Sequence, residues 1–263
     1  MALQSLAKQG FQVKFLSHAR AILEADFPSV LAEVETALGA LTIPIEEIIG
    51  SGGGETQGTQ RLRRALEAAG WKKASFEIKK TINGVERESQ SHEVDHVRTM
   101  EGSGVVALEI EWNNKDPFFD RDLENFKRLH AEGAISVGII VTRGVSMQDQ
   151  LRMLVRRFAE KRKLSSLADL TELGLNPTPR QKADYASRMK QEGVSFPDAW
   201  SSSFVQDKFG AATTHWRKLE DRVRRGVGNP CPLLLIGLPA SIVTFQRPLP
   251  PSTGVAKKRR KNL

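Results

Sequence analysis

The chain has 263 residues, enough to bury a sizeable core as one domain with insertions, and its 40% hydrophobic and 27% charged residues are ordinary for a soluble globular protein. Its single cysteine, Cys231, excludes an internal disulfide and a cysteine-rich zinc module, and it fits a reducing cytoplasm. The net charge of +8 is concentrated at the C-terminus, and neither a signal peptide nor an apolar run of the roughly 20 residues that cross a bilayer is evident, so we expect a cytoplasmic protein outside the membrane.

The first predicted elements are helices. Apolar residues spaced along residues 17–39 predict one amphipathic helix, with Leu23, Leu31 and Leu38 in its apolar stripe. A glycine-rich break at residues 51–54 separates it from a second helix over residues 57–69. Gly70 follows that helix as the left-handed residue that commonly ends one.

Strands are predicted next. Residues 75–82 form one strand, and Asn83-Gly84 predicts a hairpin turn after it. Further strands are expected near residues 92–98 and 104–112, the second ended by Asp116-Pro117. A helix over residues 118–131 follows, and the nearly continuous apolar run at 134–142 is typical of a central strand covered on both faces.

The last third of the chain alternates helices with less regular sequence. A long basic helix is predicted over residues 147–163, and residues 164–212, rich in turn formers, are expected to be a less regular insertion. A helix over 214–225 and a buried strand over 232–238 follow. Residues 1–248 are therefore predicted to form a single α/β domain with a central mixed sheet.

Beyond that domain, residues 249–263 are proline-rich and then basic, with contiguous cations at 257–261. This composition predicts a disordered tail. The alternative is an arm that binds nucleic acid without sequence preference and raises encounter rates.

Acidic residues in two predicted strands are the sharpest chemical signal. They are Asp95 in HEVDHV, and Glu109 and Glu111 in VALEIEW. Because alternate side chains of a strand share a face, the two glutamates lie on the face of Val105 and Ala107. The opposite face is apolar throughout, so the glutamates are expected at the end of an otherwise buried strand.

Carboxylates gathered there repel each other, since two unit charges about 4 Å apart interact by roughly 4 kcal/mol at an effective dielectric constant near 20. A bound divalent cation removes the conflict, and oxygen ligands suit Mg²⁺. Such a cation activates water and polarises a phosphodiester. For the acids alone, a solvated pair on an exposed strand is the favoured alternative.

The surrounding sequence resembles the BglII/BstYI-type restriction endonucleases of the PD-(D/E)xK nuclease superfamily. The likeness runs in order through HEVDHV, VALEIEWNNKDPFFDRDLENFKRLH and AISVGIIVTRG, and more weakly through SGGGETQGTQRLRRALEAAGW and ATTHWRKLEDRVRRG. It implies a restriction-endonuclease-like fold with helices flanking the central mixed sheet. It also implies a homodimer that cuts palindromic double-stranded DNA with Mg²⁺, a GATC-containing target and a cognate DNA methyltransferase.

The resemblance also assigns roles to the acids. Asp95 and Glu109 take the family's metal-ligand positions, and the backbone carbonyl of Ile110 completes the protein ligands. Glu111 stands where many members of the superfamily have lysine, so it is either the general base or an outer-sphere ligand.

Two fallback acids stay open should Asp95 not be the ligand. Glu93 shares the predicted face of Asp95, and Glu77 lies on a neighbouring strand. His92 and His96 flank Asp95 but lack a third ligand of the same kind, so zinc is not expected.

Two segments are candidates for DNA contact. Asn113 and Asn114 follow the acidic strand, where their amides are able to read base edges, or they form an ordinary turn. Thr213, Thr214 and His215 begin a late helix that resembles a DNA-contacting segment of the family, although either threonine could instead be an N-cap. The glycine-rich break at 51–54 is either a flexible start for its helix or a loop that touches DNA phosphates.

The predicted function is a type II restriction endonuclease in which metal-activated water attacks the phosphodiester, with each subunit cutting one strand. The rival hypotheses are a repair or junction-resolving nuclease of the same superfamily and a catalytically inactive DNA-binding protein. A third is a solvated acid pair in an unrelated fold.

Overall fold

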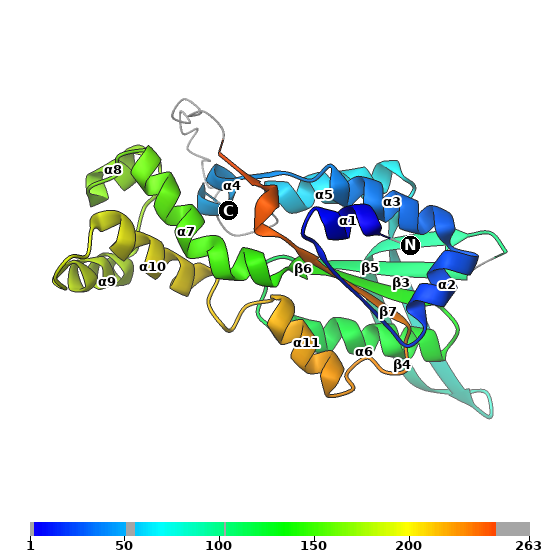
Figure 1. The fold of residues 1–263 in the computed structure, drawn as a ribbon. Coiled ribbons are helices and arrows are strands. Elements are labelled where there is room, and N and C mark those ends of the chain that lie inside the picture. The colour runs from blue at the N-terminus through cyan, green and yellow to red at the C-terminus, as the bar shows by residue number, and fades with distance from the viewer. Residues whose placement is uncertain (1–2, 51–55, 103, 246–263) are drawn as a thin grey trace, which may run out of the picture.

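A six-stranded mixed sheet in the order β1-β7-β6-β5-β4-β3 is the centre of the computed structural model, which describes residues 3–50, 56–102 and 104–245 (Figure 1). The central strands β5, β6 and β7 are parallel, and β1, β4 and β3 pair antiparallel at the edges. The strands are β1 (Gln12–Leu16), β3 (Lys72–Ile82), β4 (Val85–Met100), β5 (Gly104–Glu111), β6 (Val137–Arg143) and β7 (Leu233–Leu238). This arrangement confirms the predicted α/β fold with a central mixed sheet, and it adds β1, which the sequence analysis missed.

Helices cover both faces of the sheet (Figure 1). One face packs against α1 (Gln4–Lys8), α2 (Ala19–Asp26), α3 (Pro28–Gly39), α4 (Ile45–Gly50), α5 (Gln57–Ala68) and α7 (Val145–Lys161). The other face packs against α6 (Phe118–Ala131) and α11 (Trp216–Arg224). In β5 the alternation is explicit, because Val106 and Leu108 join the first apolar cluster and Ala107 joins the second.

The single helix predicted over residues 17–39 is wrong, because the chain breaks it into α2 and α3. Phe27 leaves the helical region with φ −132° and ψ 43°, and Pro28 is the first residue of α3. Proline lacks an N–H and disfavours helical backbone in the residue before it, so it starts a helix more readily than it continues one.

The β3–β4 hairpin is confirmed. Asn83 and Gly84 have φ values of 51° and 78°, the left-handed pair that a tight type I′ turn requires. Strand β4 is longer than the predicted 92–98. In β6, which begins at Val137, Gly138 allows Phe126 of α6 to approach, since a Cβ there would lie 2.4 Å from its ring.

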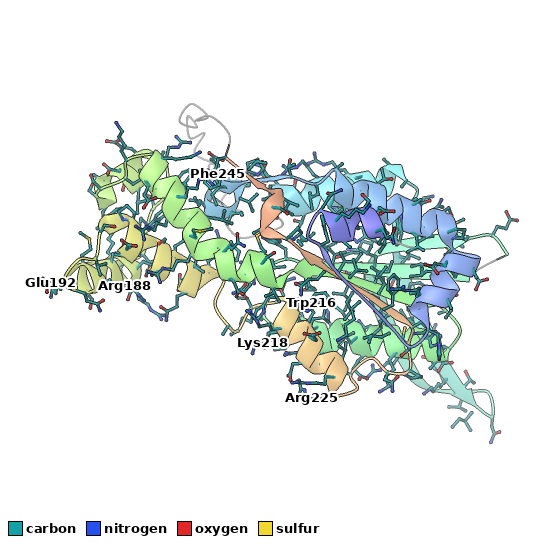
Figure 2. The ribbon with its side chains drawn as sticks, viewed as in Figure 1. Arg188, Glu192, Trp216, Lys218, Arg225 and Phe245 are labelled. Carbon is teal, nitrogen blue, oxygen red and sulfur yellow. The ribbon has the colours of Figure 1, made fainter. Side chains whose placement is uncertain are left out.

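Residues 164–212 are helical, so the expected irregularity is wrong. They form α8 (Leu167–Glu172), α9 (Pro179–Met189) and α10 (Phe196–Lys208), which extend with α7 away from the sheet (Figure 1). Ser166 and Thr178 begin reciprocal capping boxes, so these turn-forming residues are helix starts. Figure 2 shows Arg188 and Glu192 at the outer end of this helical arm.

Short elements complete the described chain. β2 (Ile43–Pro44) pairs in parallel with β8 (Val243–Thr244), and the 3₁₀ helix η1 (Ala240–Ile242) precedes β8. The glycine-rich break at 51–54 and the tail at 249–263 lie outside the described residues. Within the described ranges, none of the helices has the length and apolar character needed to span a membrane.

Candidate active site

The acidic end of β5 lies where β4 separates from it. The β4–β5 ladder ends at the pair His96–Leu108, whereas β5 continues beside β6 up to the pair Glu111–Thr142. Glu109 and Glu111 therefore follow the divergence of the two strands, on the face that α6 covers.

Both glutamates are buried. Glu109 is 6% exposed and Glu111 is 3% exposed, so the alternative of a solvated acid pair on an open strand does not hold. Buried carboxylates lose hydration and are rarely left without a compensating partner. At this edge of the sheet, each buried carboxyl therefore requires either a proton or a compensating positive charge.

Asp95 lies beside Glu109. Its backbone N–H donates a 3.3 Å hydrogen bond to Glu109 Oε1. The two residues also line one cavity of about 420 Å³, together with Ser91, His92, Glu93, Arg121 and Asn125. The structure thus brings Asp95 and Glu109 to the same hollow.

The carboxylate of Asp95 is turned outward. Its side chain is 58% exposed, and it lies 3.6 Å from Lys73 Nζ, which also contacts Glu93 at 2.6 Å. The other fallback acid, Glu77, pairs with Lys79 on β3 and is not among the residues that line the cavity. Of the fallback acids, Glu93 is therefore the one that shares the cavity with Asp95.

The environment of the glutamates strongly favours their protonated forms. Burial raises the pKa of Glu109 to about 9, and the nearby charges of Asp122 and Asp95 add to that shift. Burial and Asp122 raise the pKa of Glu111 to about 8, while the Asn114 amide and Arg121 oppose the rise. A bound cation would oppose these upward shifts, because it favours the ionised carboxylates.

Asp122 on α6 is a third buried acid at this site, and the sequence analysis missed it. It is 2% exposed. Its Oδ1 accepts a 2.8 Å hydrogen bond from Arg121 Nε and lies 2.7 Å from Arg121 Nη2. The available signal was its position within the apolar stripe of the helix, three residues after Phe119 and four before Phe126. An acid in such a stripe indicates a partner inside the fold.

These residues supply the oxygen ligands that a hard divalent cation prefers, and their buried charge is what such an ion would compensate. In residues 3–50, 56–102 and 104–245, however, no three His, Cys, Asp or Glu side chains are gathered closely enough to enclose an ion. Asp95 faces Lys73, and Glu111 accepts a hydrogen bond from the Asn114 amide. The acids therefore have the chemistry that such an ion prefers, while their side chains are not arranged around one.

The backbone of β5 suits the role expected for the Ile110 carbonyl. The Leu108 carbonyl lies 3.2 Å from His96 Nδ1 of β4, and the Glu111 carbonyl accepts from Thr142 Oγ1 of β6 at 2.7 Å. Carbonyls alternate in direction along a strand, so that of Ile110 points to the β4 side, where Asp95 lies.

The two segments expected to contact DNA are joined to each other. The Asn114 N–H donates to Thr214 Oγ1 at 3.0 Å, and the Thr214 N–H donates to the Asn114 carbonyl at 2.9 Å. Asn114 itself is exposed, whereas Thr214 and His215 are buried. The N-cap of α11 is His215, so neither Thr213 nor Thr214 is the N-cap.

Arg143, at the end of β6, ties these segments together. It is fully buried, and its guanidinium donates to the Trp112 carbonyl at 2.8 Å, to Gln148, to Thr213 Oγ1 at 2.6 Å and to the Thr214 carbonyl at 2.7 Å. A buried arginine fork with several acceptors holds a rigid arrangement. The loop after β5 and the start of α11 (Figure 2) therefore form one unit beside the acids.

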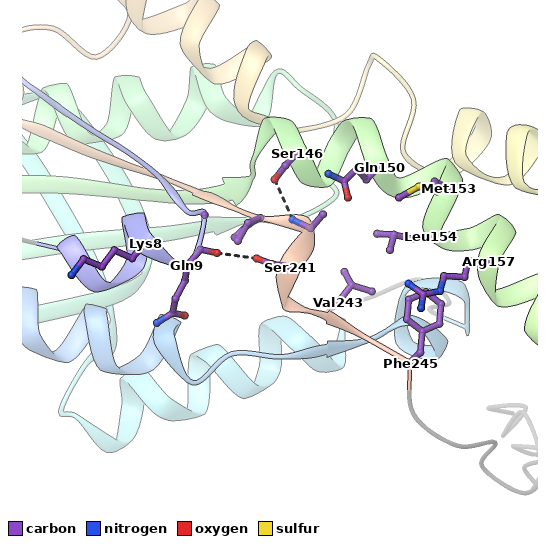
Figure 3. A pocket seen from close by; sticks show the side chains of 13 residues that line it. Lys8, Gln9, Ser146, Gln150, Met153, Leu154, Arg157, Ser241, Val243 and Phe245 are labelled. Atoms are coloured by element: carbon purple, nitrogen blue, oxygen red, sulfur yellow. Dashed lines mark hydrogen bonds between the residues drawn. The ribbon is translucent and has the colours of Figure 1, made fainter.

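A second hollow, with a volume of about 550 Å³, lies between α7, the end of α1 and the segment around η1 (Figure 3). Its walls are held by Ser241 donating to the Gln9 carbonyl and by the Ala240 N–H donating to Ser146. The described residues that line it include Lys8 and Arg157 but no carboxylate. It lacks the chemistry of the acidic cavity.

Comparison with known proteins gives the family. The family model described as restriction endonuclease BglII/BglIII matches residues 11–238, which include every acid of the cavity and both candidate DNA-contact segments. No curated protein matches the chain. The family match confirms the resemblance seen in the sequence and the restriction-endonuclease-like fold. The chain therefore belongs to the BglII/BglIII restriction endonuclease family and is a type II site-specific deoxyribonuclease.

Proposed function

We propose that the protein makes Mg²⁺-dependent double-strand cuts in palindromic DNA, with the acids at the end of β5 as its active site. The family acts on double-stranded DNA, and type II restriction endonucleases generally use divalent metal ions. The observation that carries the proposal is the burial of Glu109 and Glu111 at the end of β5, with Glu109 and Asp95 lining one cavity.

Ion binding and proton transfer are assigned to different residues of the site. Glu109, Asp95 and the Ile110 carbonyl would hold the ion, which would supply a more acidic bound water and stabilisation of the leaving oxygen. Glu111 is oriented by the Asn114 amide at 2.9 Å and accepts the proton of the attacking water. Hydrogen bonding to Asn114 keeps its carboxylate aimed in one direction.

The remaining assignments extend this proposal. Residues 1–248 act as a single catalytic domain with residues 164–212 as an insertion, and two copies bind a palindrome so that each cuts one strand. The family resemblance supports a GATC-containing site, a cognate DNA methyltransferase and a cytoplasmic location. Asn113, Asn114, Thr213, Thr214 and His215 are proposed to contact the DNA, and residues 249–263 to form a basic tail.

Digestion of a sequenced plasmid with MgCl₂, followed by mapping of the ends, tests the function. One fixed palindromic cut site is expected. Structure-selective nicking of branched DNA would favour a repair or junction-resolving nuclease, and binding without cleavage would favour an inactive DNA-binding protein. Cleavage by Glu109→Ala at the wild-type rate would show that the active site is assigned wrongly. Glu124→Ala, at a partly exposed residue of α6 that pairs with Lys127, is the matched control.

A further inference from the structure

Asp122 is a buried acid whose two carboxylate oxygens are in different situations. Its side chain is 1% exposed, and Arg121 occupies only the Oδ1 oxygen. The Oδ2 oxygen is buried and has no hydrogen-bond partner among the described residues. A buried carboxylate oxygen without a donor is costly, so it requires either a proton shared with a neighbouring carboxyl or a cation.

The neighbours of Asp122 are the acids of the active site. Its charge is the largest influence after burial on both Glu109 and Glu111, and it also interacts with Asp95 across the strand end. The Asp122 and Glu111 carboxyls are within hydrogen-bonding reach of each other, and each is only an acceptor when ionised. Two facing carboxylates require either a shared proton or a cation.

If the acids at this point are all ionised, the side chains around them do not balance their charge. Glu109, Glu111 and Asp122 are all buried, and Arg121 forms ion pairs with Glu111 and Asp122. Three ionised carboxylates against one guanidinium leave two negative charges, which is the charge of one divalent ion. An apolar residue at position 122 would pack with Phe119 and Phe126 without this cost.

We propose that Asp122 is a further ligand of the divalent-cation site, contributing Oδ2 to the ion held by Glu109 while Arg121 fixes its Oδ1. The proposal rests on the proposed function, because it takes the same ion as its ligand. It predicts a site in which α6, and not only the two strands, determines how tightly the ion is held.

Binding of Mn²⁺ alone, measured by calorimetry without DNA, tests the proposal directly. Asp122→Asn keeps the shape of the side chain and its ability to face Arg121, but removes the charge. Its affinity for Mn²⁺ is expected to fall about 10- to 100-fold, in the range known for losses around metal sites. The matched control is Asp120→Asn, two residues earlier on α6, where the carboxylate pairs with Arg222. This variant should bind Mn²⁺ as tightly as the wild type does.

The outcomes separate this proposal from the proposed function. If Asp122→Asn binds Mn²⁺ as tightly as the wild type while Glu109→Gln does not, Asp122 is no ligand and the catalytic assignment stands. If the wild-type protein itself binds no Mn²⁺, both the ligand role and the metal-dependent mechanism are wrong.

A second measurement covers the case in which Asp122→Asn does not fold. In wild-type crystals soaked with MnCl₂, the anomalous peak is expected about 2.0–2.6 Å from Asp122 Oδ2, the range of oxygen ligands to such ions. A peak coordinated by Glu109 but well beyond that range from Asp122 would overturn the proposal without any variant.

Discussion

The side-chain amide of Asn114 donates a 2.9 Å hydrogen bond to Oε2 of Glu111. The bond joins the loop after β5, a candidate for reading DNA bases, to an acid at the centre of the active site. Asn114 is also tied through its backbone to Thr214 at the start of α11. A movement of either segment on binding DNA would therefore reach the Glu111 carboxylate.

Asn114→Ala should shift the pH dependence of cleavage. The amide favours the ionised form of Glu111, so its loss should raise the pKa of that carboxyl further and move the acidic limb of the pH–rate profile upward. Because hydrogen bonds to charged groups contribute about 1.5–3 kcal/mol, the rate at pH 7 should fall roughly tenfold or more. Single-turnover cleavage from pH 6 to 9 measures both effects.

The control for that variant is Lys115→Ala in the same loop, which should leave the position of the acidic limb unchanged. A profile for Asn114→Ala that superimposes on the wild-type profile, together with relaxed sequence preference, would instead assign Asn114 to base reading alone.

The metal-free protein should lose stability as the pH rises from about 5 to 9. The pKa of Glu109 is raised to about 9 in the folded state, above its unfolded value, so its stabilising contribution is complete below the unfolded pKa and is lost on approach to pH 9. Each such group contributes a slope of up to about 1.4 kcal/mol per pH unit. Urea unfolding in EDTA should show this decline, and MgCl₂ should reduce it.

Glu109→Gln isolates the contribution of that carboxyl. The slope for the variant in EDTA should be shallower than for the wild type by about one bound proton, and MgCl₂ should have less effect on it. Identical slopes for the two proteins would show that Glu109 is ionised in the metal-free fold.

The sequence predicted the order of the sheet elements well, because binary patterns and turn residues carry that information locally. Asn83-Gly84 determined the hairpin, and the apolar run of β6 indicated a strand covered on both faces. The errors arose where one residue type serves two purposes. Pro28 starts a helix inside an apparently continuous stripe, and Ser166 and Thr178 cap helices in a segment that reads as turns.

Part of the active site was predictable because the local pattern of the sequence marks it. Glu109 and Glu111 stand out because they occur in a strand that is otherwise apolar, and alternation places them on one face. The apolar stripe of α6 marks Asp122 as an acid that faces the fold, but which acids it meets there depends on how α6 packs against the sheet, and that required the structure. The outward turn of Asp95 toward Lys73 depends on a strand pairing between β3 and β4, so it too required the structure.

Arg143→Met should destabilise the protein by at least about 3 kcal/mol, because four acceptors on three segments lose their donor inside the fold. The same substitution at Arg156 of α7, which makes exposed ion pairs, should cause no measurable loss. Denaturant unfolding of both variants provides the comparison. A stable Arg143→Met would mean that the loop after β5 and the start of α11 are held by other contacts.

Lys73→Ala should strengthen binding of the divalent ion. In the structure Lys73 Nζ lies 3.6 Å from Asp95 and 2.6 Å from Glu93, so it competes with the ion for the carboxylate that must turn inward. The pair is exposed and screened by salt, so we expect a gain of only a few-fold in Mn²⁺ affinity, smaller at high ionic strength. Lys79→Ala, which frees Glu77 on the same strand outside the cavity, should leave the affinity unchanged. Weaker Mn²⁺ binding by Lys73→Ala would show that Lys73 orders the site, whereas unchanged binding with impaired cleavage would place Lys73 against the DNA phosphate.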